Sequence, residues 1–182
     1  MNKKIILIDM DGVLADFEAG FIKAWQRKFP KSPHIPLEKR KAFSVRNDYP
    51  KELEKDVESI YTAPGFFQNL PVIAGGKEAL AKMEALGHEV FICTSLIRYF
   101  ENCVLEKYHW VLKNLGYEWT KRIIVVKDKT LIYGDMLIDD KPEPVGLKKP
   151  AWKHVLFDRP YNRNVKDNLR ITWDTWEKIL SL

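Results

Sequence analysis

Near its N-terminus the chain carries an apolar run that ends in two carboxylates, and this feature constrains the fold most. Ile5–Ile8 has the length and composition of a strand buried in a parallel sheet. Asp9 and Asp11 follow where that strand must end, and Gly12 supplies a turn. Acidic side chains at the carboxyl edge of such a sheet are costly unless a cation or a reaction uses them. The pattern favours an open α/β sheet with a charged site over two aspartates that only cap the next helix.

Short apolar segments recur along the chain and predict five strands. They are Lys4–Asp9, His88–Cys93, Arg122–Val126, Met136–Asp139 and His154–Phe157. Two helices are predicted between them, over Gly76–Leu86 and Arg98–Leu115. The second has an apolar stripe formed by Phe100, Val104, Tyr108, Val111 and Leu115. This alternation predicts a Rossmann-like, three-layer α/β/α fold with a parallel sheet and helices on both faces.

Residues 16–74 break this alternation. They begin with a predicted helix that has an aromatic face, continue through several prolines and contain a charged helix near Lys51–Tyr61. No strand of the parallel sheet is evident in them. We therefore expect a catalytic core of residues 1–15 and 75–182, with a helical cap of residues 16–74 placed over the active edge as a lid.

Composition restricts the cellular setting and the partners. The 182 residues are 46% apolar, enough for a real core, and no apolar run approaches the length of a membrane span. The apolar run at the N-terminus is too short for a signal peptide, so we expect a cytoplasmic protein with no membrane partner. The net charge of +5 comes from dispersed lysines and arginines. It favours a small anionic substrate over a stable nucleic-acid partner.

Further polar residues follow the later predicted strands. Thr94 and Ser95 follow the second strand, Lys129 lies just beyond the third, and Asp139 and Asp140 close the fourth. The same sheet edge thus gathers acids, hydroxyls and a lysine. Carboxylate oxygens suit Mg²⁺, and a carboxylate can attack phosphorus while a second one transfers protons. Hydroxyl, amide and lysine donors stabilise a transferring phosphoryl group.

These motifs resemble those of a known superfamily. Asp9–Val13 is similar to motif one of the haloacid dehalogenase-like (HAD) phosphohydrolases, and the later polar residues match motifs two, three and four in order. Longer strings resemble the cytosolic and mitochondrial 5'(3')-deoxyribonucleotidases. They are Phe91–Ser95, Glu106–Tyr108, Asp128–Thr130, Leu137–Asp140 and His154–Phe157. The resemblance covers nearly the whole chain and implies a Mg²⁺-dependent phosphatase that acts on deoxyribonucleoside monophosphates through an aspartyl-phosphate.

The resemblance also implies roles for the acidic residues. Asp9 would be the nucleophile and a Mg²⁺ ligand. Asp11 would be the general acid and base, and would bind Mg²⁺ through its backbone carbonyl. Asp140 would be the direct metal ligand from motif four, with Asp139 beside it as an outer or alternate ligand. Asp135, which precedes the same strand, lies roughly 13 Å from Asp139 at the usual rise per residue and is expected to be structural.

The remaining implied roles concern phosphate and substrate. Thr94 and Ser95 would hold phosphate oxygens, and Lys129 would balance the charge of the nucleophile and the phosphate. The expected contacts to the base and sugar are Phe17, Phe43, Val45, Tyr61 and Phe66. Helix-bundle core is the other reading of these apolar side chains. The pair Phe43-Ser44 departs from the aromatic pair of the family, which leaves the base preference open.

Other functions compatible with the same motifs stay open at this point. The first alternative keeps the chemistry and changes the substrate to a sugar phosphate or another small phosphoester. A 3'-phosphatase acting on nucleic-acid ends is suggested by the sequence pI near 9.1. A non-enzymatic binding protein is disfavoured because it would not need Asp11. The resemblance further implies a homodimer.

Overall fold

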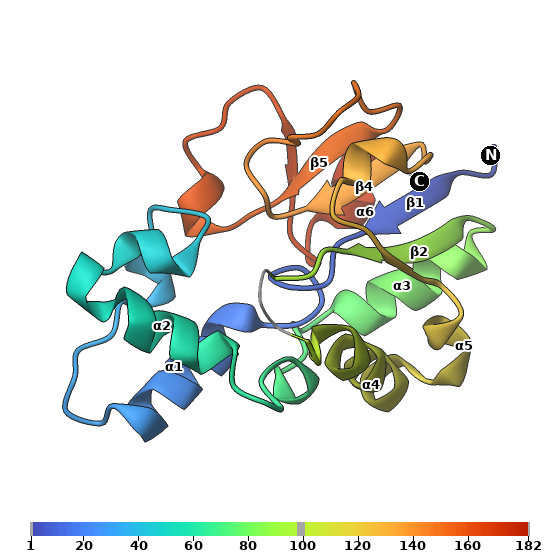
Figure 1. Cartoon of the computed structure of the whole chain (residues 1–182). Helices are drawn as coiled ribbons and strands as arrows, with labels where there is room; N and C mark the ends of the chain where they lie inside the picture. Colours follow the sequence, from blue (N-terminus) through green and yellow to red (C-terminus); the bar gives the residue numbers. More distant parts are fainter. Residues whose placement is uncertain (1, 98–100, 182) are drawn as a thin grey trace.

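A six-stranded parallel sheet organises the chain in a computed structural model that describes residues 2–97 and 101–181 (Figure 1). The strand order is β3-β2-β1-β4-β5-β6. The strands are β1 (Ile5–Ile8), β2 (Glu89–Thr94), β3 (Ile123–Val125), β4 (Met136–Asp139), β5 (Lys153–Phe157) and β6 (Leu169–Ile171). The five predicted strands are all present. The sequence reading missed β6, which is only three residues long and carries the charged Arg170 at its centre.

The first strand lies in the middle of the sheet. Ile6 of β1 is in register with Val90 of β2 on one side and with Met136 of β4 on the other. The order of the strands therefore reverses at β1. In open α/β sheets, ligands bind beyond the carboxyl ends of the strands at such a reversal. Motifs one, two and four lie at the ends of β1, β2 and β4.

Six α-helices accompany the strands in the described part of the chain. They are α1 (Phe17–Lys28), α2 (Glu54–Tyr61), α3 (Gly76–Ala85), α4 (Cys103–Leu115), α5 (Tyr117–Thr120) and α6 (Trp176–Leu180). The predicted helices over residues 76–86 and 51–61 match α3 and, after a 3₁₀ turn, α2. None of these helices is long and apolar enough to cross a membrane. The predicted positions Arg98 and Phe100 lie outside the described residues.

The predicted stripe of α4 was partly wrong. Val104 is 45% exposed, whereas the buried face of the helix is made by Cys103, Glu106, Lys107, Trp110 and Val111. The periodicity of apolar residues predicted the wrong face because two residues of the buried face, Glu106 and Lys107, are charged. A helix buries a charged pair when tertiary partners satisfy it, and such partners are not visible in a local pattern.

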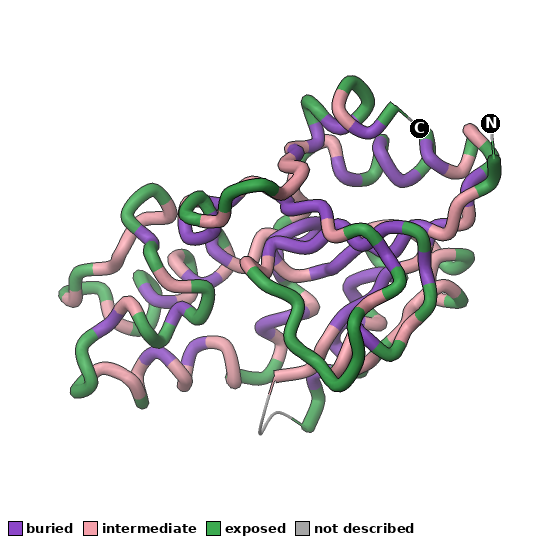
Figure 2. The backbone as a smooth tube through the Cα atoms, turned by 90° about the horizontal axis from the view of Figure 1, so that it is seen from above, coloured by how far each residue is buried: buried purple, intermediate pink, exposed green. Residues whose placement is uncertain are grey.

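The two faces of the sheet are covered differently. On one face Ile6, Ile8 and their neighbours share a large core with side chains of α3, α4 and α6. On the other face Leu7, Cys93 and Leu137 pack against Trp152 from a loop. Figure 2 shows the buried stretches of the backbone concentrated in the middle of the molecule. The predicted three-layer α/β fold is confirmed. On the second face of the sheet, the loop that carries Trp152 covers the strands.

The segment between β1 and α3 forms a helical lobe beside the sheet, at the left of Figure 1. Asp16 begins α1 by accepting a hydrogen bond from Ala19 N at 3.0 Å. The two segments that join the lobe to the sheet are hydrogen-bonded to each other. Asp16 N donates to Pro71 O, and Ile73 N donates to Leu14 O, both at 2.8 Å. Backbone hydrogen bonds therefore hold the entry and the exit of the lobe together.

A buried carboxylate from α4 holds the returning end of this lobe. Glu106 accepts hydrogen bonds from Gly65 N at 2.6 Å and Phe67 N at 3.0 Å. Trp110, one turn further along α4, donates from Nε1 to Leu70 O at 2.8 Å. These contacts satisfy backbone groups that would otherwise be buried without partners. They also fix the segment that leads back to the sheet next to the candidate site.

Candidate active site

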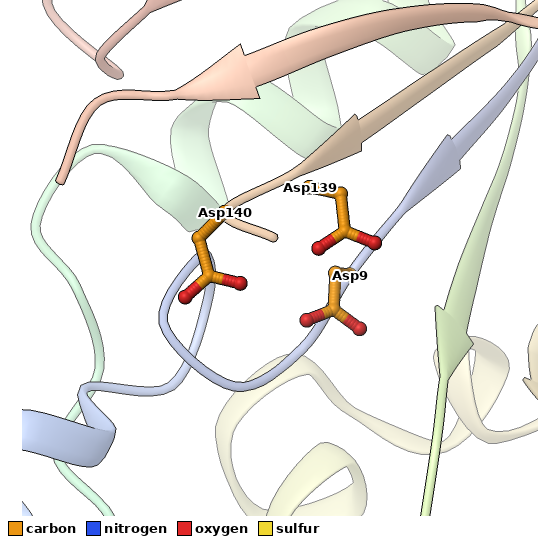
Figure 3. Close-up of side chains that lie close together, drawn as sticks. All are labelled: Asp9, Asp139 and Asp140. Carbon is orange, nitrogen blue, oxygen red and sulfur yellow. The ribbon is translucent and has the colours of Figure 1, made fainter. Parts of the chain in front are cut away.

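Three aspartates meet at the carboxyl edge of the sheet. Asp9 follows β1, whereas Asp139 ends β4 and Asp140 follows it. The strands are neighbours, and Asp9 N donates to Ile138 O at 2.9 Å. One carboxylate oxygen from each aspartate lies within 4.8 Å of the others, and all three residues are buried. Figure 3 shows the three carboxylates turned toward one another. The structure thus brings together the acids of motifs one and four.

Lys129 bridges two of these acids. It lies in a short 3₁₀ helix, Lys129–Leu131, whose first turn is capped by Asp128 through Thr130 N at 2.9 Å. Its ammonium donates to Asp9 Oδ1 at 2.5 Å and to Asp139 Oδ2 at 2.7 Å. Burial disfavours the charged form of Lys129, but the two carboxylates outweigh burial and raise its pKa above the ordinary value. This lysine is therefore a fixed positive charge beside Asp9.

The charge of the cluster favours a divalent cation. Burial raises the pKa of Asp9 to about 6, against the opposing effect of Lys129. Burial, and then the charges of Asp139 and Asp9, raise the pKa of Asp140 well above its usual range. Burial alone would raise the pKa of Asp139, but Lys129 holds it below the ordinary value. Three carboxylates thus face one ammonium, and an all-oxygen donor set with excess negative charge suits Mg²⁺.

Gly12 is required beside this cluster. Its φ of +81° is unfavourable for other residues, and a Cβ there would lie 2.2 Å from Asp140 Oδ2. The turn after β1 therefore passes so close to Asp140 that a side chain at position 12 would collide with its carboxylate. This explains why motif one has a glycine where it meets Asp140 of motif four.

The sequence reading missed Lys107 as a residue of the site. Its side chain on α4 is 1% exposed, and its ammonium donates to Asp11 Oδ2 at 2.5 Å, Thr94 Oγ1 at 2.7 Å and Ser95 O at 2.8 Å. The feature that could have identified it is a lysine on the buried face of a helix, next to the buried Glu106. A buried lysine needs anionic or polar partners, and here they belong to motifs one and two.

The other predicted polar residues also reach the site. Asp11 is held by Lys107 through Oδ2, and its Oδ1 is buried without a hydrogen-bond partner among the described residues. Thr94 is fully buried. The Ser95 hydroxyl donates to Val126 O at 2.8 Å, so it joins the ends of β2 and β3. Asp135 lies before β4 and accepts a hydrogen bond from Ile5 N at 2.6 Å, a structural contact as expected.

The predicted substrate contacts are a cluster of three aromatic rings, a separate exposed ring and a buried valine. Phe17 lies 5.4 Å from Phe66 and 6.2 Å from Tyr61, measured between ring centroids. Phe43 is 45% exposed and lies 6.0 Å from the ring of Tyr161. Val45 and Phe66 are 5% and 8% exposed, and both belong to the hydrophobic core. The structure therefore gathers Phe17, Tyr61 and Phe66 and places Phe43 against another ring.

Known proteins match the chain over nearly its whole length. A family model described as "5' nucleotidase, deoxy (Pyrimidine), cytosolic type C protein" matches residues 3–182. A Bordetella pertussis protein named "Putative 5'(3')-deoxyribonucleotidase" is 48% identical over 97% of this chain and 95% of its own. The human "5'(3')-deoxyribonucleotidase, cytosolic type" is 44% identical over 96% of this chain and 92% of its own.

A solved structure confirms the fold class. The "putative HAD-hydrolase YfnB" of Bacillus subtilis, bound to magnesium, has a TM-score of 0.63 at 14% identity, with full coverage of both chains. At this identity the likeness concerns the fold alone. The family model and the relatives show that the chain, whose fold is that of a HAD-like hydrolase, is a phosphomonoester hydrolase and belongs to the 5'(3')-deoxyribonucleotidase family.

Proposed function

We propose that the protein is a Mg²⁺-dependent phosphatase that releases phosphate from deoxyribonucleoside monophosphates through an aspartyl-phosphate. The observation that carries the proposal is the cluster of Asp9, Asp139 and Asp140 around the Lys129 ammonium. Lys107, which is paired with Asp11, also contacts Thr94 at the end of β2. The names of the relatives supply the substrate class.

The metal would be held by Asp9, Asp140 and the backbone carbonyl of Asp11, with Asp139 beside them. Lys129 already occupies one oxygen of Asp139, and Lys141 N donates to the other at 2.9 Å. This leaves Asp140 as the better donor from motif four. Bound there, Mg²⁺ would neutralise phosphate charge and bring the phosphorus to Asp9.

Two carboxylates share the covalent steps. A carboxylate oxygen of Asp9 attacks phosphorus, and the bond to the nucleoside oxygen breaks. A proton on Asp11 Oδ1, the oxygen that Lys107 leaves free, passes to the departing oxygen and yields the nucleoside. Asp11 then takes a proton from water as the water oxygen attacks phosphorus. The phosphorus–Asp9 bond breaks, which releases phosphate and restores the Asp9 carboxylate.

Donors around the nucleophile would hold the phosphoryl oxygens. Thr94 ends β2, the strand next to β1, and Ser95 follows it, whereas Lys129 contacts Asp9 directly. The Ser95 hydroxyl is engaged with Val126 O, so its backbone N–H is the donor that we assign to phosphate. Such preorganised donors act on the charge that develops in the transition state.

Residues 16–74 would act as a cap on a core of residues 1–15 and 75–182. We assign contacts with the base or sugar to the aromatic cluster of Phe17, Tyr61 and Phe66, and a further contact to the exposed ring of Phe43. An apolar wall near the sugar would disfavour a 2'-hydroxyl. We further propose a cytosolic location, after the human relative of cytosolic type, and a homodimer.

A substrate panel tests the proposed function. The purified protein with Mg²⁺ is assayed for phosphate release from dTMP, dUMP and their ribonucleotides, from 3'-nucleotides, from a sugar phosphate and from a 3'-phosphorylated oligonucleotide. Because an apolar wall discriminates by ~1–3 kcal/mol, kcat/KM should favour deoxyribonucleotides by about 10- to 200-fold. A higher kcat/KM for the sugar phosphate, or salt-sensitive activity confined to the oligonucleotide, would overturn the substrate assignment.

Lys107→Met is expected to lower kcat by about 10²- to 10³-fold, as loss of a single preorganised donor does. The variant leaves Asp11 and Thr94 without their shared ammonium. Lys113→Met, a substitution at an exposed position of the same helix, is the control and should retain full activity. Steady-state kinetics compare the two variants, and equal activity would show that Lys107 is only structural.

A further inference from the structure

A short segment after β5, residues 159–162, is hydrogen-bonded to the acidic cluster and to the turn after β1. Arg159 Nε donates to Gly12 O at 2.8 Å, in the turn that follows Asp11. Asn162 Nδ2 donates to the backbone oxygen of Asp140 at 2.8 Å. Between them, the Tyr161 hydroxyl donates to a carboxylate oxygen of the same Asp140. This segment therefore holds both the backbone and the side chain of one acid in the cluster.

The ring of Tyr161 lies against the helical lobe. The Arg40 guanidinium carbon lies 5.4 Å from its centroid, and the Phe43 ring lies 6.0 Å away in an edge-to-face arrangement. Arg40 is itself buried and forms ion pairs with Glu18 and Asp48. Tyr161 thus touches a loop of residues 40–43 with its ring and Asp140 with its hydroxyl.

We propose that Tyr161 is a positioning residue for Asp140, which transmits the position of the 40–43 loop to the metal-binding carboxylate; this inference rests on the proposed Mg²⁺ site. The hydroxyl occupies one carboxylate oxygen and leaves the other for the cation. Hydrogen-bond partners that orient a ligand commonly contribute 10- to 100-fold to metal affinity. Because the Tyr161 ring contacts Arg40 and Phe43, the position of the loop determines where the hydroxyl lies on Asp140.

Metal affinity measured without substrate tests the first half of the proposal. Tyr161→Phe keeps the ring and removes the hydroxyl. Tyr133→Phe, at a position 68% exposed, is the matched control. Mg²⁺ binding is measured by titration calorimetry and Mn²⁺ binding by electron paramagnetic resonance. For Tyr161→Phe we expect a Kd about tenfold higher, with kcat largely restored at excess Mg²⁺. A Kd within twofold of the wild type would overturn the proposal.

A double-mutant cycle tests the link to the loop. Phe43→Ala should raise the Kd for Mg²⁺ several-fold in the wild-type background and leave it unchanged in Tyr161→Phe, where the link to Asp140 is already cut. Additive effects, or no effect of Phe43→Ala alone, would overturn the transmission from the loop. Failure of the proposed function is distinguishable, because the wild-type protein would then bind no Mg²⁺ and release no phosphate.

Discussion

Asp9→Asn is expected to lower kcat by at least about 10⁴-fold, the scale seen when a covalent nucleophile is removed. The amide keeps the shape of the side chain but is a poor nucleophile for phosphorus. Phosphate release from the preferred nucleotide measures the effect. No labelled phosphoryl-enzyme should form when the variant is mixed with substrate and quenched. Retention of more than a few per cent of activity would rule out Asp9 as the nucleophile.

The same variant should remain folded. Asp9 is one of three buried carboxylates facing one ammonium, and Lys129 keeps its contact with Asp139 when Asp9 becomes neutral. Thermal unfolding without metal should therefore show a Tm equal to or above that of the wild type. Asp135→Asn makes the same chemical change at the other end of β4, where the side chain accepts from Ile5 N. It should keep full activity.

Removal of divalent cations is expected to abolish turnover, and added Mg²⁺ should restore it. Mg²⁺ should also raise the Tm, because it binds the folded cluster and not the unfolded chain. At a concentration of 100 Kd this stabilisation is about 2.7 kcal/mol, or about 5–10 °C for a chain of this size. Calorimetry or fluorescence with and without a chelator measures the shift.

The effect of Mg²⁺ should depend on pH in a defined direction. Burial raises the pKa of Asp9 to about 6, so protons compete with the cation for this carboxylate below that pH. Affinity for Mg²⁺ should therefore fall as the pH drops through about 6. Asp140→Asn should remove the Tm shift at every pH. Full turnover after exhaustive chelation, or an equal Tm shift in Asp140→Asn, would contradict the assigned metal site.

The central strands and the motif residues could be predicted because their signals are local. Ile5–Ile8 and Leu137–Ile138 are apolar runs that end in acids, and the carboxyl ends of neighbouring parallel strands must meet. The short β6 gave too weak a signal for its three residues. On α4 the apolar periodicity selected the exposed Val104. The true buried face includes Glu106 and Lys107, whose burial depends on distant partners.

The sequence by itself determined the class of chemistry, since two carboxylates, hydroxyls, a lysine and a second acid pair fall in order at the ends of strands. Only the tertiary structure decided how these groups are held. It joined Lys107 to Asp11, 96 positions away, Tyr161 to Asp140, and Glu106 to the returning segment of the lobe. The physical reason is that periodicity reports which way a side chain faces within its own element. The partner that makes a buried charge stable comes from another element, and the fold alone selects it.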